Sequence, residues 1–138
     1  MYSQESFLEF EIIWKDDDML ELKVFASNGS YSGTTEVYDT SDSLLRFAKT
    51  LIGYPAESPT LTYQAEHGSN NSFVMTFYCV DNSGHIGVQI ELEEMVREGQ
   101  QNKIKFEIIV VPSCIDNFQM ELVQLATTRN GTARLHVH

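Results

Sequence analysis

The sequence predicts an α+β domain: a largely antiparallel sheet of about seven strands with two helices packed on it, in the order β-β-β-α-β-β-β-β-α. Apolar and polar residues alternate over most of the chain, which is typical of strands with one buried face. Two stretches change to helical spacing, and most predicted strands are joined by connections of hairpin length. We expect a single domain over 1–138, whose sheet either curls into a half-barrel or splits into two packed sheets.

The first 38 residues predict a three-stranded antiparallel meander. Residues 8–14 alternate apolar with mostly acidic side chains, and 20–26 repeat the alternation after a polar turn at 16–18. Asn28-Gly29 is a strong signal for a type I′ hairpin turn, because that turn needs positive φ at both central positions. A third strand follows at 31–38. The apolar row of the first strand, which we expect to face the core, consists of Leu8, Phe10, Ile12 and Trp14.

The first helix is predicted at 41–52. Thr40 or Ser41 can cap its start, where the carboxylate of Asp42 favours the positive end of the helix. Gly53 can end the helix, and the chain cannot continue it through Pro55. The apolar stripe at helical spacing consists of Leu44, Leu45, Phe47, Ala48, Leu51 and Ile52.

The second half of the chain returns to the strand pattern. A turn at 81–84 separates two strands, and 97–102 is predicted to be a polar loop. The predicted strands lie at 61–65, 73–80, 86–92 and 104–110. The apolar row of the second of these strands consists of Phe73, Met75, Phe77 and Cys79.

A second helix is predicted directly after Pro112, with Ser113 as its N-cap. Its apolar side consists of Ile115, Phe118, Leu122 and Leu125. The tail at 127–138 is polar at first and then alternates, so it is either a mobile end or an edge strand.

The net charge of −11 is concentrated near the start of the chain. Residues 1–45 hold ten carboxylates against two cations, Lys15 and Lys23, which is a net charge of −8. Such a field speeds encounter with a basic partner and repels nucleic acid and membrane surfaces. We therefore expect a basic protein as partner, no nucleic acid and no membrane. The chain has no secretory-signal pattern and no apolar run near the ~18 residues of a membrane span, so the expected location is cytoplasmic.

The titratable residues do not form a recognisable catalytic or metal motif. Asp16-Asp17-Asp18 lacks the spacing of a calcium loop, and His136 with His138 lacks further ligands, so no metal is expected. Glu91 and Glu93 should lie on the solvated face of a strand, with Glu94 beside them. No nucleophile elbow or phosphate-binding loop occurs, so we expect neither an enzyme nor a cofactor. Cys79 and Cys114 are expected to be buried and reduced. A disulfide between them remains the alternative if the fold brings the two residues together.

Seven aromatic residues leave two interpretations open. They cover the second face of the sheet beneath a helix, or they serve as anchors within an acidic surface, as suits an interface with a basic protein. These residues are Phe7, Phe25, Tyr31, Tyr38, Tyr54, Tyr63 and Tyr78.

The stretch 20–55 contains an alternating strand, the turn Tyr31-Ser32-Gly33 into a further strand, and a helix that reads Leu45-x-Phe47-Ala48-x-x-Leu51-x-Gly53-Tyr54-Pro55. This quarter of the chain resembles small bacterial immunity proteins of the WapI-like group. The resemblance implies a small cytosolic protein that neutralises a toxin delivered by a competing cell, without a cofactor.

The charge pattern and the resemblance together favour an immunity-like inhibitor that occludes a basic, toxin-like or nuclease-like partner. Two alternatives stay open: a self-associating structural or regulatory module, for instance a homodimer, and a half-barrel that binds a small ligand. The residues predicted to contact the basic partner are Glu9, Glu11, Asp16, Asp17, Asp18, Glu21 and Glu36.

Overall fold

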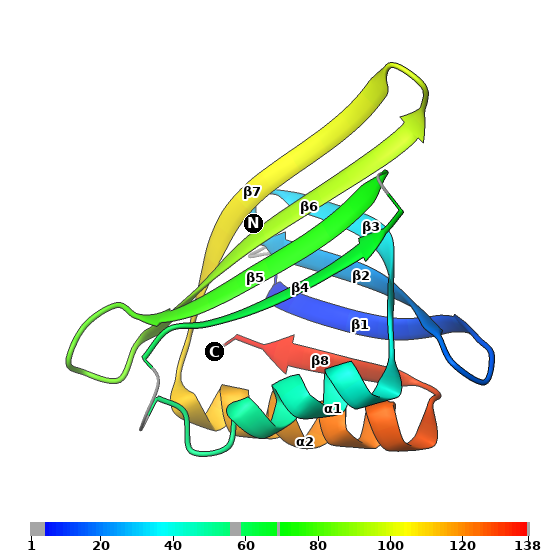
Figure 1. The fold of residues 1–138 in the computed structure, drawn as a ribbon. Coiled ribbons are helices and arrows are strands. Elements are labelled where there is room, and N and C mark those ends of the chain that lie inside the picture. The colour runs from blue at the N-terminus through cyan, green and yellow to red at the C-terminus, as the bar shows by residue number, and fades with distance from the viewer. Residues whose placement is uncertain (1–4, 56–58, 69, 138) are drawn as a thin grey trace.

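A computed structural model describes residues 5–55, 59–68 and 70–137. It shows an α+β fold with one antiparallel sheet in the order β7-β6-β5-β4-β3-β2-β1-β8 and two helices (Figure 1). The sheet has eight strands, one more than predicted, because part of the tail forms an edge strand paired with β1. The elements are β1 (Ser6–Lys15), β2 (Leu20–Asn28), β3 (Ser32–Asp39), α1 (Ser41–Thr50), β4 (Leu61–His67), β5 (Asn71–Cys79), β6 (Ile86–Arg97), β7 (Gln100–Val110), α2 (Pro112–Thr128) and β8 (Thr132–His136).

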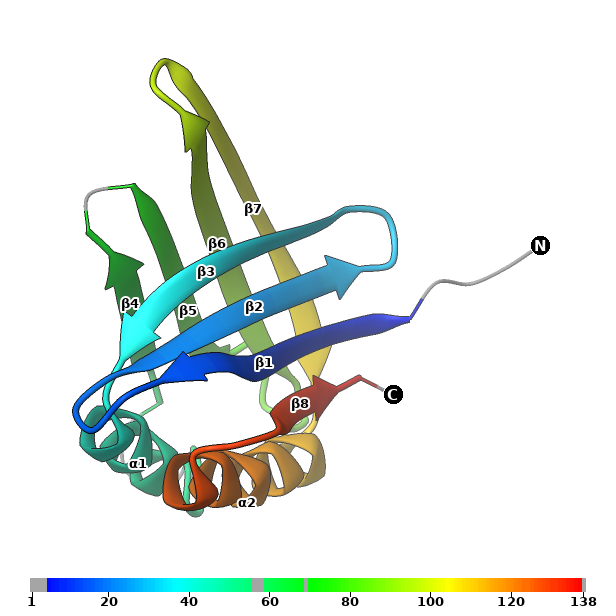
Figure 2. The same cartoon turned by 90° about the vertical axis from the view of Figure 1, so that its right-hand side faces the viewer.

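The sheet curls sharply between β3 and β4, which share only the pair Tyr38 and Glu66. The two halves of the sheet, β8-β1-β2-β3 and β4-β5-β6-β7, therefore turn their inner faces toward each other (Figure 2). The Thr35 hydroxyl donates to the Glu93 carbonyl at 2.9 Å and ties the halves together. Gly33 is needed at this approach, because a Cβ there would lie 3.1 Å from side-chain carbons of β6 and β7.

The core lies between the inner face of the sheet and the two helices, which pack side by side (Figure 1). Phe10 is fully buried at its centre, with its ring 5.5–5.8 Å from the rings of Tyr63, Phe73 and Phe118. One residue each from β1, β4, β5 and α2 thus forms a single aromatic cluster. The helices contribute the further buried side chains Leu44, Phe47, Ala48, Ile115, Leu122 and Leu125.

The helix boundaries follow local sequence signals. The Thr40 hydroxyl accepts a hydrogen bond from the Ser43 N–H at 3.1 Å, so Thr40 is the N-cap of α1. The prediction of Ser113 as the N-cap of α2 is wrong. Pro112 already occupies the first helical turn, where its missing N–H costs nothing, and Val111 stands at the cap position.

Trp14 does not face the core, which corrects the predicted apolar row of the first strand. The ladder between β1 and β2 shifts register between Ile12 and Trp14, where a β-bulge adds one residue to β1. The extra residue reverses the alternation, so Ile13 and Trp14 are 41% and 47% exposed. Trp14 consequently pairs with Glu21 on the outer face of the sheet.

Two turns differ from their predictions. Residues 29–31 connect β2 to β3. Of Asn28 and Gly29 only Gly29 has positive φ (93°), so the prediction of a type I′ turn centred on Asn28-Gly29 is wrong. The predicted loop at 97–102 is much shorter in the structure. β6 and β7 continue to Arg97 and from Gln100, and Gly99, with φ of 81°, makes the tight connection.

The two cysteines are free thiols, of which Cys114 is buried and Cys79 is exposed. The prediction of a buried Cys79 is wrong, because Cys79 is the last residue of β5 and the buried row of that strand stops at Phe77.

Two buried tyrosines beside the core predict a stability loss at high pH. Burial, followed by the adjacent Asp39 carboxylate that accepts its hydroxyl at 2.5 Å, raises the pKa of Tyr63 well above its usual value. Burial, followed by the nearby Cys79 thiol, raises the pKa of Tyr54 to about 12. Tyrosines of the unfolded chain ionise near pH ~10, so above that pH the unfolded state releases protons that the folded state keeps.

The free energy of unfolding should therefore be insensitive to tyrosine ionisation below about pH 10 and fall above it, by up to ~1.4 kcal/mol per pH unit for each tyrosine. Urea denaturation between about pH 8 and pH 11.5 measures this slope. Tyr63→Phe should be less stable at pH ~8, because Asp39 loses a hydrogen-bond donor, yet show a flatter alkaline slope. Equal slopes in the variant and the wild type would contradict the assignment to Tyr63.

Candidate functional site

The outer side of β1, β2 and β3 forms the candidate site, which we call the acidic face. Side chains on this side alternate with the buried rows of the three strands, and four of the seven predicted contact residues lie here. Cross-strand pairing places Glu11, Lys23 and Glu36 in one row. In Figure 2 the three strands lie in front of the other half of the sheet, and neither helix covers them. The four residues are Glu9, Glu11, Glu21 and Glu36.

The other three predicted residues occupy the turn between β1 and β2. The Asp16 carboxylate accepts the N–H groups of Met19 at 2.8 Å and Asp18 at 2.9 Å, and these bonds hold its pKa below the usual value. Asp16 therefore shapes the turn. Asp17 and Asp18 are exposed and, with Asp42 at the start of α1, border a cavity of about 390 Å³.

Two arginines from the end of the chain reduce the negative charge at this site. Arg129 lies in the same cavity as Asp17 and donates to the main-chain carbonyls of Asp16 and Met19. Arg134 on β8 lies 3.6 Å from Glu9 and 3.5 Å from Glu5. These two cations offset part of the net charge of −8 that residues 1–45 carry.

The predicted residues therefore differ in how free their carboxylates are. Glu9 is paired with Arg134, and Glu21 lies 3.8 Å from His67 with only 17% of its side chain exposed. The Asp16 carboxylate is bonded to main-chain N–H groups, and across the described residues no cation stands within ion-pair distance of the remaining four predicted carboxylates. These unpaired carboxylates belong to Glu11, Asp17, Asp18 and Glu36.

Aromatic side chains lie between the carboxylates of the acidic face. Phe25, 36% exposed, stacks on Phe7 at 5.2 Å, and the Arg134 guanidinium lies 3.9 Å above the Phe7 ring. Trp14 contacts Tyr38 at 6.2 Å between ring centroids. Of the seven aromatic residues that the sequence left open, Tyr54 and Tyr63 belong to the core, whereas Phe25 and Tyr31 are exposed.

Sequence reasoning missed Trp14 and the two arginines as parts of this site. A signal for Arg134 was present, because the alternation of Ala133, Leu135 and Val137 places Arg134 on the opposite face of the strand. No comparable signal marks Trp14, since its exposure depends on the bulge in β1.

The titratable residues outside the acidic face include the glutamates of β6 and the histidines considered in the sequence analysis. On the far half of the sheet Glu91 lies 3.7 Å from Lys103, and Glu93 accepts the Gln101 amide at 2.6 Å. Among the described residues no three His, Cys, Asp or Glu side chains are placed to hold a metal ion. His136 lies 3.9 Å from Glu5, and His138 is outside the described residues. Within the described chain, neither helix has the length and apolar character required to cross a bilayer.

The structure thus defines an α+β protein with a curled antiparallel sheet, one half of which carries an acidic outer face. Comparison of the chain with protein-family models, curated proteins and solved structures finds no match. The resemblance of 20–55 to WapI-like immunity proteins therefore stays a prediction.

Proposed function

We propose that the protein is an acidic binding domain of the cytoplasm that neutralises a basic protein partner, as an immunity-like inhibitor neutralises a toxin. The observation that carries the proposal is the acidic face, where the unpaired carboxylates of Glu11 and Glu36 lie on the same side as the exposed rings of Trp14 and Phe25. A face on which carboxylates outnumber cations and aromatic anchors lie between the carboxylates suits an interface with a basic protein.

The carboxylates and the rings have separate roles in this mechanism. The negative field steers the partner to the face and raises the association rate, an effect that salt weakens. Trp14 and Phe25 then bury apolar area against the partner, which slows dissociation. The flanking carboxylates Asp17 and Asp18 extend the negative surface beyond the strands. Inhibition follows from covering the partner, so the mechanism uses neither a nucleophile nor a cofactor.

A low-salt pull-down from the source organism tests the proposal. The protein is immobilised, the bound fraction is eluted with rising salt, and the eluate is identified by mass spectrometry. We expect one stoichiometric basic protein that salt releases and that the variant Glu11→Lys/Glu36→Lys fails to retain. Recovery of only a second copy of this chain, as a salt-insensitive homodimer, would count against the proposal.

A further inference from the structure

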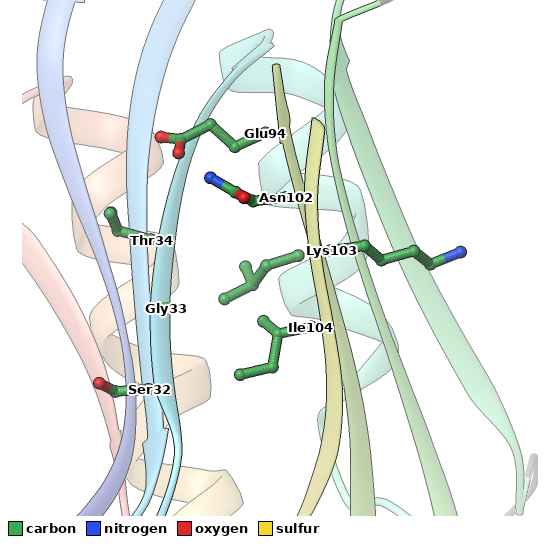
Figure 3. Close-up of a pocket in the computed structure, with 8 residues that line it drawn as sticks. Ser32, Gly33, Thr34, Glu94, Asn102, Lys103 and Ile104 are labelled. Carbon is green, nitrogen blue, oxygen red and sulfur yellow. The ribbon is translucent and has the colours of Figure 1, made fainter. Parts of the chain in front are cut away.

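β3 and β6 both extend beyond the end of the β4–β5 hairpin and leave a notch in the sheet. The ladder between β5 and β6 stops at Ser72 and Glu93, although β6 continues to Arg97. In the part of the chain that the structure describes, 32–37 of β3 has no strand partner on the side away from β2. The space beside this stretch is a cavity of about 390 Å³, which we call the β3 groove. It is lined by Ser32, Thr34, Leu92, Glu94, Asn102 and Ile104 (Figure 3).

One wall of the β3 groove is main chain. Figure 3 shows the side chains of Ser32 and Thr34 pointing away from the cavity, so these residues line it through their backbone. The Asn28 N–H donates to the Tyr31 carbonyl, and hydrogen-bonded pairs alternate along an antiparallel ladder. Tyr31 is hydrogen-bonded to β2, so the next residue, Ser32, and every second residue after it direct their N–H and C=O groups away from β2. The Glu36 carbonyl confirms this direction, because it accepts the Asn71 side-chain amide at 3.1 Å.

The opposite wall changes from apolar to polar along the inner rows of β6 and β7. The inner row of β6 ends in Leu92 and then Glu94, and that of β7 begins with Asn102 before Ile104. Glu94 and Asn102 are directly paired across the two strands. Figure 3 shows both side chains directed toward β3. The groove thus has an apolar end beside a polar end that offers one carboxylate and one amide.

The polar groups of the groove lack partners in the described chain. No hydrogen bond or ion pair engages the side chains of Glu94 and Asn102 there. Lys103 adjoins the cavity, but its side chain points to the outer face, where it lies 3.7 Å from Glu91 (Figure 3). A ligand that fits the groove would therefore meet a free carboxylate and an unpaired strand edge at the same place.

We propose that the β3 groove binds an extended, positively charged peptide segment as an added strand along Ser32–Thr34, the stretch of β3 that lines the cavity and ends before the Glu36 carbonyl bonded to Asn71. Main-chain hydrogen bonds to a free strand edge supply affinity, and alternate side chains of the added strand enter the groove. One inward side chain would contact the partly buried Ile104 beside Leu92, and the next inward side chain, a Lys or Arg, would reach Glu94. The Glu36 side chain of the acidic face lies two residues along β3 from Thr34, so the two sites are tested separately with a variant that leaves β3 unchanged.

The test is an NMR titration of the ¹⁵N-labelled protein with the peptide acetyl-Ser-Thr-Val-Thr-Lys-Thr-Ser-amide at low salt. Its Val and Lys lie on one face of an extended strand, as the groove requires. We expect saturable shifts of the Ser32 and Thr34 amides. Replacement of the peptide Lys by Glu should abolish binding, and Glu94→Gln should weaken it about fivefold, the effect of an ion pair of ordinary strength.

Backbone pairing is tested separately. Two peptide isomers with N-methyl groups on alternate residues remove the donors of one edge or the other, and we expect one isomer to lose binding while the other retains it. In the protein, Thr34→Pro removes the edge N–H, and Thr34→Val, which keeps it, is the matched control. Thermal unfolding shows whether the proline variant folds. If it does not, the N-methyl isomers alone show whether the peptide pairs with the main chain of β3.

Three results would overturn the proposal. The first is no saturable shift at millimolar peptide, and the second is equal binding of the Lys and Glu peptides. The third is a concentration-dependent shift of the same amides without peptide, accompanied by a dimer in sedimentation velocity, which would assign the groove to a second copy of the chain. Peptide binding that survives Glu11→Lys, a change on β1, would show that the groove does not depend on the acidic face.

Discussion

Phe10→Ala is expected to lower the free energy of unfolding by about 3–5 kcal/mol, the usual cost of deleting a large buried aromatic side chain. The ring is fully buried and contacts aromatic rings from three other elements, those of Tyr63, Phe73 and Phe118. Neighbours on β4, β5 and α2 cannot all move inward to fill the space, so most of the cavity should persist. For a domain stabilised by ~5–15 kcal/mol this loss is a large share of the total.

Phe25→Ala is the matched control, because it removes the same atoms from the outer face of β2. Phe25 is 36% exposed and stacks on Phe7, so we expect a cost of about 1 kcal/mol. Urea denaturation of both variants and the wild type gives the two differences directly. Equal losses in the two variants would show that Phe10 is not the centre of the core.

The two predictions differ because Phe10 lies on the covered inner face of the sheet and Phe25 on its open outer face, and the covered face could be predicted from the sequence. Strict alternation of apolar residues between Leu20 and Ala26 identifies the buried side of β2. The first helix was equally predictable, since Thr40 supplies a cap and the apolar stripe has helical spacing, although α1 ends at Thr50 and not at 52 as predicted, which leaves Ile52 exposed. Local periodicity is sufficient to predict a helix or strand and its buried side where that element has a single face against the core.

Features that depend on distant parts of the chain could not be predicted in this way. The bulge that exposes Trp14 is a property of the β1–β2 ladder, and no residue type in β1 requires it. The position of Arg134 beside Glu9 depends on β8 returning to pair with β1, 125 residues further along the sequence. The candidate site was therefore predicted as a set of carboxylates, whereas its partial neutralisation and its aromatic anchors follow only from the tertiary fold.

A different kind of signal marks the β3 groove. Glu94 and Asn102 continue the inner rows of β6 and β7, where the alternation predicts apolar residues. A polar residue in a buried row indicates that the row has left the core, although the sequence does not tell which strand it then faces. Here the facing element is β3, because the sheet curls where β3 and β4 share one pair.

The second large effect is expected in the association kinetics with the basic partner recovered by pull-down. Glu11→Lys/Glu36→Lys should lower the association rate constant at low salt by about 10- to 100-fold and flatten its dependence on ionic strength. Both carboxylates are unpaired and exposed, and they lie on either side of Lys23 in one cross-strand row. Their replacement would turn this row into three adjacent cations that repel a basic protein.

Glu98→Lys/Asp116→Lys separates a local effect from one of total charge. Glu98 lies in the β6–β7 turn and Asp116 on α2, both exposed, so this variant changes the net charge by the same amount away from the acidic face. We expect it to slow association only a few-fold at about 0.1 M salt, where screening limits the reach of exposed charges to about 10 Å. Surface plasmon resonance over a range of salt concentrations measures both rate constants, and circular dichroism verifies that each variant is folded. Equal slowing by the two variants would mean that net charge alone steers the partner, and that the acidic face is not where it binds.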